Sequence, residues 1–303
     1  MRITQSMLAR VGIEQLRSQR NRLAITQERA ATGLRINRPS DDPVDYRTTL
    51  YLKDALGQTG KFLRAIDLSR TRLQTTEEAI GDSNLVIGNL KTIAIEASNT
   101  SNQSPSARTA LRTEVEQLFD QLLEYSNVRA PGGGYVFAGT ESDTAAFQQA
   151  GSFVSGGAPP TVAFTGQASA IEVEIDEGVR IEVTADGSQV FQGTVDVFEV
   201  VGRLWQGIDA NDQTLISSAL GDLDRAFDQL SDARTRIGGS GRKADDFEER
   251  LRLQEQEFIS QISFLEDADA YEVYSDLVTQ ESSLQASLQV TTRLLQPTLL
   301  DYL

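Results

Sequence analysis

Apolar side chains follow two different spacings along the chain. Toward both ends they recur every three or four residues, which is typical of helices, whereas in the middle they alternate with polar residues, which is typical of strands. The pattern therefore predicts a mainly α-helical fold with a β-rich insert. We expect the N- and C-terminal segments to form a long α-helical rod and the insert to form a smaller β domain.

The first helical segment carries an apolar edge whose members stand seven residues apart. They are Leu16, Leu23 and Ala30, with Ile13 and Leu34 beside them. The edge stops where residues 37–39 (Asn-Arg-Pro) interrupt the pattern. We therefore expect one helix that ends at these residues, followed by a polar turn.

A longer helix is predicted directly after this turn. Asp42 can accept a hydrogen bond from an unpaired N–H, and Pro43 at the first helical position gives up no bond, so the pair is a good helix start. If it is unbroken from Val44 to Asn99, this helix is about 80 Å long. One seam continues along it for six heptads with a single polar member: Leu52, Thr59, Ile66, Leu73, Ile80, Ile87 and Ala94.

Glycines interrupt this predicted helix at positions 57, 60, 81 and 88. They leave two interpretations open, namely close packing against another helix, or joints and bends. The same start signature returns at Ser104 and Pro105, and a further apolar stripe ends near Val128. Two antiparallel helices are therefore expected here.

The composition changes between Gly132 and Gly193. This window holds 11 of the 23 glycines and a single basic residue, Arg180. Apolar and polar residues alternate over 171–176 and again over 181–184, on either side of a turn at 176–178. We expect a β-hairpin there with one face in water.

Helical spacing returns after the insert. A stripe from Ile216 to Ile237 has apolar residues at steps of four and three, and Gly238 and Gly239 are predicted to end that helix, as C-terminal glycines commonly do. The last segment carries one further seam, followed by Pro297 and an apolar tail. The members of that seam are Ala270, Tyr274, Leu277, Glu281, Leu284, Leu288, Thr291 and Leu295.

These patterns together predict three domains. Residues 1–44 and 255–303 form a terminal helical coiled-coil domain, to which we assign assembly. Residues 45–131 and 194–254 form an α-helical rod domain, and residues 132–193 form the β-rich inserted domain.

The composition lacks the residues that most enzyme classes use for acid–base or nucleophilic catalysis. The chain contains no His and no Cys, which excludes zinc fingers, thiol nucleophiles, Ser-His-Asp triads and His-ligated metals. The net charge of −16 disfavours contact with nucleic acid or with an anionic membrane. No apolar run is long enough for a transmembrane helix, and residues 1–10 lack the apolar region of a secretory signal.

Three local motifs have a chemical interpretation and a simpler one. Glu141 with Asp143, and Asp222 with Asp224 and Asp228, are acids of the kind used in glycoside hydrolysis, but acids so close in sequence are usually solvated surface charge. The set at Asp222 also lacks the glycine and the terminal glutamate of a calcium loop. Residues 238–243 (Gly-Gly-Ser-Gly-Arg-Lys) look like a phosphate-binding loop, but no strand precedes them and no Ser or Thr follows the lysine. We therefore expect a helix connection at 238–243, no enzyme activity, no metal and no cofactor.

The two ends of the chain carry opposite charges. Residues 1–40 contain eight arginines and two glutamates, a balance of +6, whereas residues 250–303 contain three arginines and nine acids, a balance of −6. A narrow apolar stripe with charges beside it is how one helix finds a partner helix in register, so we expect the two ends to pack together. The arginines are open to three interpretations: a solvated helix face, pairing with a partner helix, or contact with nucleic acid or membrane.

A helical pair of this kind has little other core, so its apolar stripes stay partly uncovered in a monomer. Identical copies that offer the same uncovered ends associate into rings or helical polymers rather than closed dimers. We therefore predict an assembly interface on the stripes. Its residues are Leu16, Leu23, Leu34, Leu277, Leu284, Leu288, Leu295, Leu299 and Leu303.

Several motifs resemble the bacterial flagellin superfamily. Residues 33–37 (GLRIN) and 39–43 (PSDDP) resemble its N-terminal signature, and residues 135–140 (YVFAGT) resemble its entry into the β domain. Residues 284–288 (LQASL) and 296–303 (QPTLLDYL) resemble the C-terminus of its junction proteins, to which the PSDDP version is also closer than to filament flagellins.

The resemblance implies a structural adaptor subunit that joins the flagellar hook, through a neighbouring hook-associated protein, to the flagellin filament, with filament flagellin itself as the alternative. The implied partners are copies of the chain in a ring, the neighbouring hook-associated protein, flagellin and a cytoplasmic export chaperone. The implied location is extracellular, at the hook–filament junction, after type III export without a cleaved signal peptide. The resemblance also implies terminal helices that become ordered on assembly.

Overall fold

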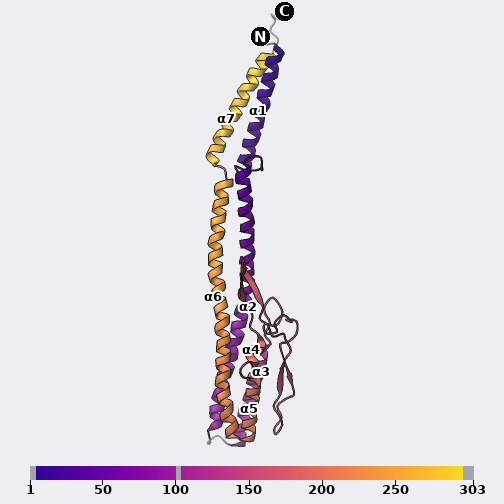
Figure 1. Cartoon of the computed structure of the whole chain (residues 1–303), viewed down its shortest axis with the longest axis vertical. Helices are drawn as coiled ribbons and strands as arrows, with labels where there is room; N and C mark the ends of the chain where they lie inside the picture. The colour runs from indigo at the N-terminus through magenta and orange to yellow at the C-terminus, as the bar shows by residue number, and fades with distance from the viewer. Residues whose placement is uncertain (1–4, 100–103, 296–303) are drawn as a thin grey trace, which may run out of the picture. The chain divides into compact units, whose positions relative to one another are not determined.

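The computed structural model describes residues 5–99 and 104–295, and these residues form two compact units. One unit combines residues 1–58 with 253–303, and the other is the continuous segment 59–252. The described residues are mainly helical with four short strands, which confirms the predicted fold class (Figure 1). We call the two parts the terminal unit and the central unit.

Two helices of the terminal unit, α1 (Gln5–Thr32) and α7 (Ala270–Leu295), pack against each other along their length (Figure 1). The prediction placed the end of α1 at residues 37–39, and this was wrong. The helix stops at Thr32 because Gly33 adopts a positive φ of 72° and its N–H donates to the carbonyl of Arg29, which closes the last turn. Leu34 therefore lies outside the helix.

Helix α2 (Pro43–Ser98) begins where the sequence predicts. The Asp42 carboxylate accepts hydrogen bonds from the N–H groups of Val44 and Asp45, each at 3.1 Å. The helix is continuous over 56 residues, so its glycines make no joint. The predicted close packing against another helix is found at Gly81, where an added Cβ would lie 3.5 Å from the Arg234 side chain. At positions 57 and 88, an added Cβ would meet nothing within 4 Å.

The central unit packs short helices and strands against parts of α2 and α6. Ser104 caps α3 as predicted, and its side chain accepts the N–H of Ala107. The elements that lie wholly within this unit are α3 (Pro105–Ser126), β1 (Phe147–Ala150), β2 (Thr161–Phe164), β3 (Glu172–Asp176), β4 (Val179–Glu182), α4 (Gly187–Gln192) and α5 (Val197–Ala210).

The strands of the described residues form two antiparallel pairs, β1 with β2 and β3 with β4. The β3–β4 pair is the predicted hairpin, and its turn contains Gly178 at a positive φ of 71°. Ile175 and Ile181 point into the core from this hairpin while their neighbours Glu174 and Glu182 are exposed, so the predicted wet face is confirmed.

Helix α6 (Gln213–Glu266) corrects a second prediction. Gly238 and Gly239 were expected to end a helix and to begin a connection, but α6 continues through both. Each helical glycine costs about 1 kcal/mol relative to alanine, and burial of one large apolar side chain outweighs that cost. Ile237 and Ala244 are both buried on either side of the glycines, so tertiary packing keeps the helix intact.

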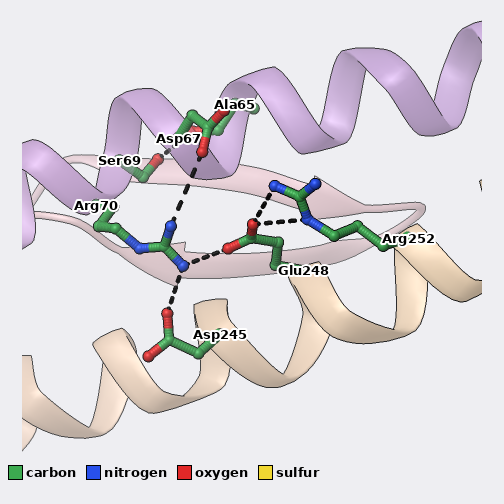
Figure 2. A network of polar contacts seen from close by, with 7 residues as sticks. All are labelled: Ala65, Asp67, Ser69, Arg70, Asp245, Glu248 and Arg252. Carbon is green, nitrogen blue, oxygen red and sulfur yellow. Dashed lines mark hydrogen bonds and ion pairs between the residues drawn. The ribbon is translucent and has the colours of Figure 1, made fainter.

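Ion pairs within the central unit also hold α6 beyond its glycines. Figure 2 shows Arg70 of α2 reaching Asp245 at 2.7 Å and contacting Glu248, whose carboxylate also binds Arg252 at 2.6 Å. Hydrogen bonds from Arg252 and Arg70 lower the pKa of Glu248 below the ordinary value of 4.5. The actual break between α6 and α7 lies at residues 267–269.

Candidate assembly interface

A corner of the terminal unit joins the turn after α1 to the break between α6 and α7. Leu34 and Asp267 form an antiparallel bridge. The N–H of Arg35 donates to the carbonyl of Glu266 at 2.6 Å, and the N–H of Ala268 donates to the carbonyl of Gly33 at 2.9 Å. Backbone hydrogen bonds therefore fasten two turns that lie more than 200 residues apart in the sequence.

The Arg35 guanidinium is the centre of this corner. Its Nη2 donates to Asp45 Oδ2 at 2.7 Å and to the carbonyl of Leu265 at 2.6 Å, and its Nη1 lies 3.7 Å from Asp42 Oδ2. The pKa of Asp42 is lowered, chiefly by the hydrogen bond from the Asp45 N–H and with a contribution from the Arg35 charge. The adjacent Ile36 is buried. The arginine therefore links the start of α2 to the end of α6.

Two further contacts stabilise the same corner. Asp41 accepts the N–H groups of Asn37 and Arg38, which closes the turn before α2. Lys53 lies 2.6 Å from Glu266, whose side chain is largely buried. Sequence patterns missed the Lys53–Glu266 pair because no spacing rule connects residues that are 213 positions apart.

The contact between α1 and α7 is a narrow inner seam with heptad spacing. Thr26 Oγ1 donates to Gln280 Oε1 at 3.1 Å, and Gly12 lies close enough that an added Cβ would sit 3.6 Å from Thr291. The buried or half-buried residues of this seam are Gly12, Leu16, Gln19, Leu23, Thr26 and Ala30 on α1, and Val273, Leu277, Gln280, Leu284, Ser287 and Thr291 on α7. Polar and small residues make up much of the seam, so it buries little apolar surface.

The structure divides the predicted C-terminal stripe between two faces of α7. Leu277 and Leu284 are half-buried in the inner seam, whereas Tyr274 and Leu288 are exposed, with Leu288 at 42%. We call the exposed row the outer face of α7. Its residues are Tyr271, Tyr274, Val278, Glu281, Gln285 and Leu288, at steps of three and four.

The other predicted interface residues lie in several places. Leu16 and Leu23 are half-buried in the inner seam with Leu277 and Leu284, while Leu34 is half-buried in the corner. Leu295 is the last residue of α7. Leu299 and Leu303 lie outside the described residues. The structure thus gathers four of the predicted leucines in one seam and leaves Leu288 on the outer face.

The charged side chains that the structure describes on α1 and α7 lie beside the seam and do not pair across it. Among the described residues, no ion pair joins α1 to α7. Arg10, Arg17, Arg20 and Arg22 are all exposed. Within one chain, these arginines form a solvated helix face.

The candidate acids outside the terminal unit have structural partners or lie in solvent. Asp222 is buried and pairs with Arg203 at 2.6 Å and with Arg225, while Asp224 lies 2.5 Å from Lys91. Glu141 and Asp143 are exposed. Within residues 5–99 and 104–295, no three acidic side chains are grouped so as to hold a metal ion, and no helix is apolar and long enough to cross a membrane.

Comparison with protein families matches residues 3–142 to the bacterial flagellin N-terminal helical region. Among curated proteins, the chain is 24% identical over 290 residues to flagellar hook-associated protein 3 of Escherichia coli K12, covering 88% of each chain. It is also 24% identical to a flagellin of Clostridium tyrobutyricum, but over 127 residues, which are 42% of this chain and 33% of that protein.

Solved structures give the same fold. A flagellar hook-associated protein 3 from Legionella pneumophila matches with a TM-score of 0.62 and 14% identity, covering 71% of this chain and 98% of that one. A flagellar junction protein structure from the same organism matches with a TM-score of 0.54 and 14% identity, covering 65% of this chain and 98% of that one. At these identities, the likeness concerns the fold.

Proposed function

We propose, from the premise that the chain belongs to the bacterial flagellin superfamily and is similar to hook-associated protein 3, that it is a structural adaptor subunit between the flagellar hook and filament. The match to the hook-associated protein spans most of both chains, whereas the match to a flagellin spans a third of that flagellin. This difference favours the junction subunit over the alternative, a filament flagellin.

One observation carries the assembly role. The inner seam covers one edge of α7 and leaves the outer face, with Tyr271, Tyr274, Val278 and Leu288, in contact with solvent. Solvent-exposed apolar rows of this kind mark sites that another protein covers. We infer that neighbouring subunits cover the outer face in the assembled flagellum.

The partners follow from this role. We propose that copies of the chain form a ring that contacts a neighbouring hook-associated protein on one side and flagellin on the other. We also propose that an export chaperone holds the C-terminal stripe before export, that the chain leaves the cell without a cleaved signal peptide, and that it has no catalytic activity. The assembly residues we propose are the leucines of the two stripes. Leu288 is the one that the structure shows to be exposed to solvent.

A substitution at Leu288 tests the assembly role directly. Leu288→Asp places a carboxylate on the outer face, so the monomer should fold normally while attachment of filaments to hooks is lost. Ser283→Asp is the matched control, because Ser283 is exposed on the same helix but lies off the outer face. Circular dichroism of the purified chains and electron microscopy of cells measure the two effects. Normal filaments on Leu288→Asp cells would contradict the proposal.

The flagellin alternative has its own test. A junction subunit should remain largely monomeric after purification, because it polymerises only on a neighbouring structure. Sedimentation velocity and negative-stain microscopy of the purified chain measure this. Spontaneous growth of long filaments would favour the filament flagellin instead.

A further inference from the structure

A groove of about 750 Å³ lies between α2 and α6 in the central unit. Both of its walls belong to the same compact unit, so they are placed with respect to each other. Glu78, Asp82 and Leu85 line it from one side of α2, at steps of four and three residues. Ser231 and Thr235 line it from α6, one turn apart. We call this space the central groove.

A buried amide lies at the floor of the central groove. Asn84 is only 9% exposed and lines the groove from α2. Its Nδ2 donates a long hydrogen bond of 3.4 Å to Ser231 Oγ, but its Oδ1 has no hydrogen-bond partner among the described residues. Since buried polar atoms are almost always paired, the unpaired Oδ1 points to a donor that the single chain does not supply.

Two carboxylates on the α2 wall have no basic partner in the described part of the chain. Asp82 is half-buried and makes neither an ion pair nor a hydrogen bond there. Glu78 accepts a hydrogen bond from the amide of Gln74 at 2.8 Å, but no cation reaches it. Arg234 also lines the groove, and its guanidinium is directed to Glu77 at 3.4 Å. The central groove therefore offers more acceptors than donors.

Apolar side chains lie at the rim of the same groove. Leu85 is 68% exposed, and the ring of Phe227 is accessible as well. The Phe227 ring already has one cationic neighbour, because Lys91 Nζ lies 5.4 Å from its centroid. Arginine and lysine pack their apolar stems on surfaces of this kind while their charged heads reach polar groups.

We infer that the central groove receives an arginine or lysine side chain from a different protein. Its stem packs on Leu85 and Phe227, and its charged head donates to Asp82, Glu78 and Asn84 Oδ1. The inference rests on the proposed junction function and adds the chemistry of one partner contact, at a place outside the terminal unit.

The charge of the central unit indicates which kind of partner fits. Residues 59–252 contain 17 basic and 29 acidic residues, a balance of −12. The central unit of a second copy brings the same excess of negative charge, so like-charge repulsion disfavours two central units at this groove. A protein that presents a basic segment is attracted instead.

Photo-cross-linking in assembled flagella tests the inference. Benzoylphenylalanine replaces Leu85 at the rim of the groove or, in a separate chain, Thr235 on the opposite wall. Both residues are exposed, so folding should be retained. Flagella are isolated from cells in which the variant replaces the natural chain and are then irradiated, and mass spectrometry identifies the attached peptide.

The expected result is an adduct with one other protein, attached within about one helical turn of an arginine or lysine. Asp82→Lys in the same chain should reduce the adduct by about tenfold or more, because it opposes one cation to another. Asp82→Asn keeps the size of the side chain and should reduce the adduct in the same direction. Asp120→Lys is the matched control, since Asp120 is an exposed carboxylate on α3 that does not line the groove.

A charge exchange then tests the contact itself. Replacement of the identified basic residue of the partner by glutamate should reduce the adduct with the natural groove. The same partner variant should restore the adduct with Asp82→Lys, because the two charges are then opposite again. A structural effect of Asp82→Lys on the chain would not be reversed by a change in the partner.

Four outcomes would overturn the inference. Attachment to a second copy of this chain would identify a different occupant. Attachment to a segment without a basic residue would contradict the proposed chemistry, as would an equal loss of adduct with Asp120→Lys. A chain that is present in the flagella but forms no adduct from either position would indicate that the groove stays open to solvent.

Failure of the proposed function gives a different result. In that case the chain is absent from isolated flagella, as an immunoblot detects before irradiation. Absence from flagella contradicts the junction function, whereas presence without the adduct contradicts the occupied groove alone.

Discussion

The central unit and the terminal unit bury apolar side chains to very different extents. Six aromatic residues are essentially inaccessible in the central unit: Phe119, Phe137, Phe147, Phe191, Phe198 and Trp205. Among the described residues of the terminal unit, Ile36 and Leu52 are the large apolar side chains that reach comparable burial. The central unit therefore contains its own core, whereas the terminal unit buries little apolar surface within the single chain.

The difference shows that helix length and heptad spacing do not by themselves measure stability. Phe147 contacts the rings of Phe191 and Phe198 at centroid distances of 5.2 and 5.5 Å, so helices and strands close on a shared cluster. Between α1 and α7, by contrast, the contact is limited to the narrow inner seam, which includes a hydrogen bond between Thr26 and Gln280. A helix gains most of its stability from the apolar face that it buries.

The largest expected contrast is in local opening. Amide hydrogens of α1 and α7 should exchange through openings of low free energy, whereas those of α5 should exchange near the limit of global unfolding, a difference of about 5 kcal/mol or more. Hydrogen exchange with mass spectrometry on the purified monomer measures both regions at once. Equal protection of α1 and α5 would remove the distinction between the two units.

A core substitution should show the next largest effect. Phe198→Ala removes a ring from the aromatic cluster and should lower the free energy of unfolding by about 3–5 kcal/mol. Leu277→Ala in the half-buried inner seam should lower it by about 1 kcal/mol or less. Urea denaturation followed by circular dichroism compares the two variants. A larger loss for Leu277→Ala would reverse the ranking of the units.

Replacement of helical glycines should increase the stability of the central unit and so widen its difference in stability from the terminal unit. An added Cβ at Gly238, Gly239 or Gly241 meets nothing within 4 Å, so alanine at each position should raise the free energy of unfolding by about 0.4–1 kcal/mol. Gly139→Ala is the control of opposite sign, because Gly139 has a positive φ of 65° and an added Cβ there would clash with the Gln167 carbonyl. Thermal unfolding measures the shifts, and a loss of stability in the α6 variants would mean that this segment needs flexible backbone.

The smallest expected effect is on how the stability of the central unit changes at acidic pH. Because Arg252 and Arg70 lower the pKa of Glu248, its contribution to stability is present above the ordinary carboxyl value of 4.5 and is lost as the pH falls through the lowered pKa. Glu248→Gln should therefore destabilise the chain at pH 7 by less than about 1 kcal/mol, and this difference should shrink at pH 3. Urea midpoints at the two pH values test this, and a difference that grows in acid would be inconsistent with the ion pairs.

Local chemistry allowed the sequence to predict several features correctly. The starts of α2 and α3 depend on a capping side chain followed by proline. The hairpin depends on alternating apolar and polar residues around a glycine turn. Each of these features is therefore determined by a few neighbouring residues. The mainly helical fold with a smaller β part follows from the same periodicities.

The end of α1 was missed although its cause is local, namely the positive φ of Gly33, whereas the other incorrect predictions depend on contacts between distant residues. Gly238 and Gly239 match the signal for a helix end, but Ile237 and Ala244 are buried by segments far away in the sequence. Tyr274 and Leu288 fit the same heptad as Leu277 and Leu284, and the position of α1 decides which of them lie in the inner seam. No periodicity contains that information.

The contacts around Arg35 also bear on the order in which parts of the chain fold. The guanidinium and the Leu265 carbonyl are 230 positions apart, and the entire central unit is encoded between them. Contacts across so long a loop form late, since chain closure must be paid for in entropy before they contribute. Whichever end of the chain is delivered first, the residues of the aromatic cluster precede the second partner of this contact, so we expect the corner to close after the cluster has formed.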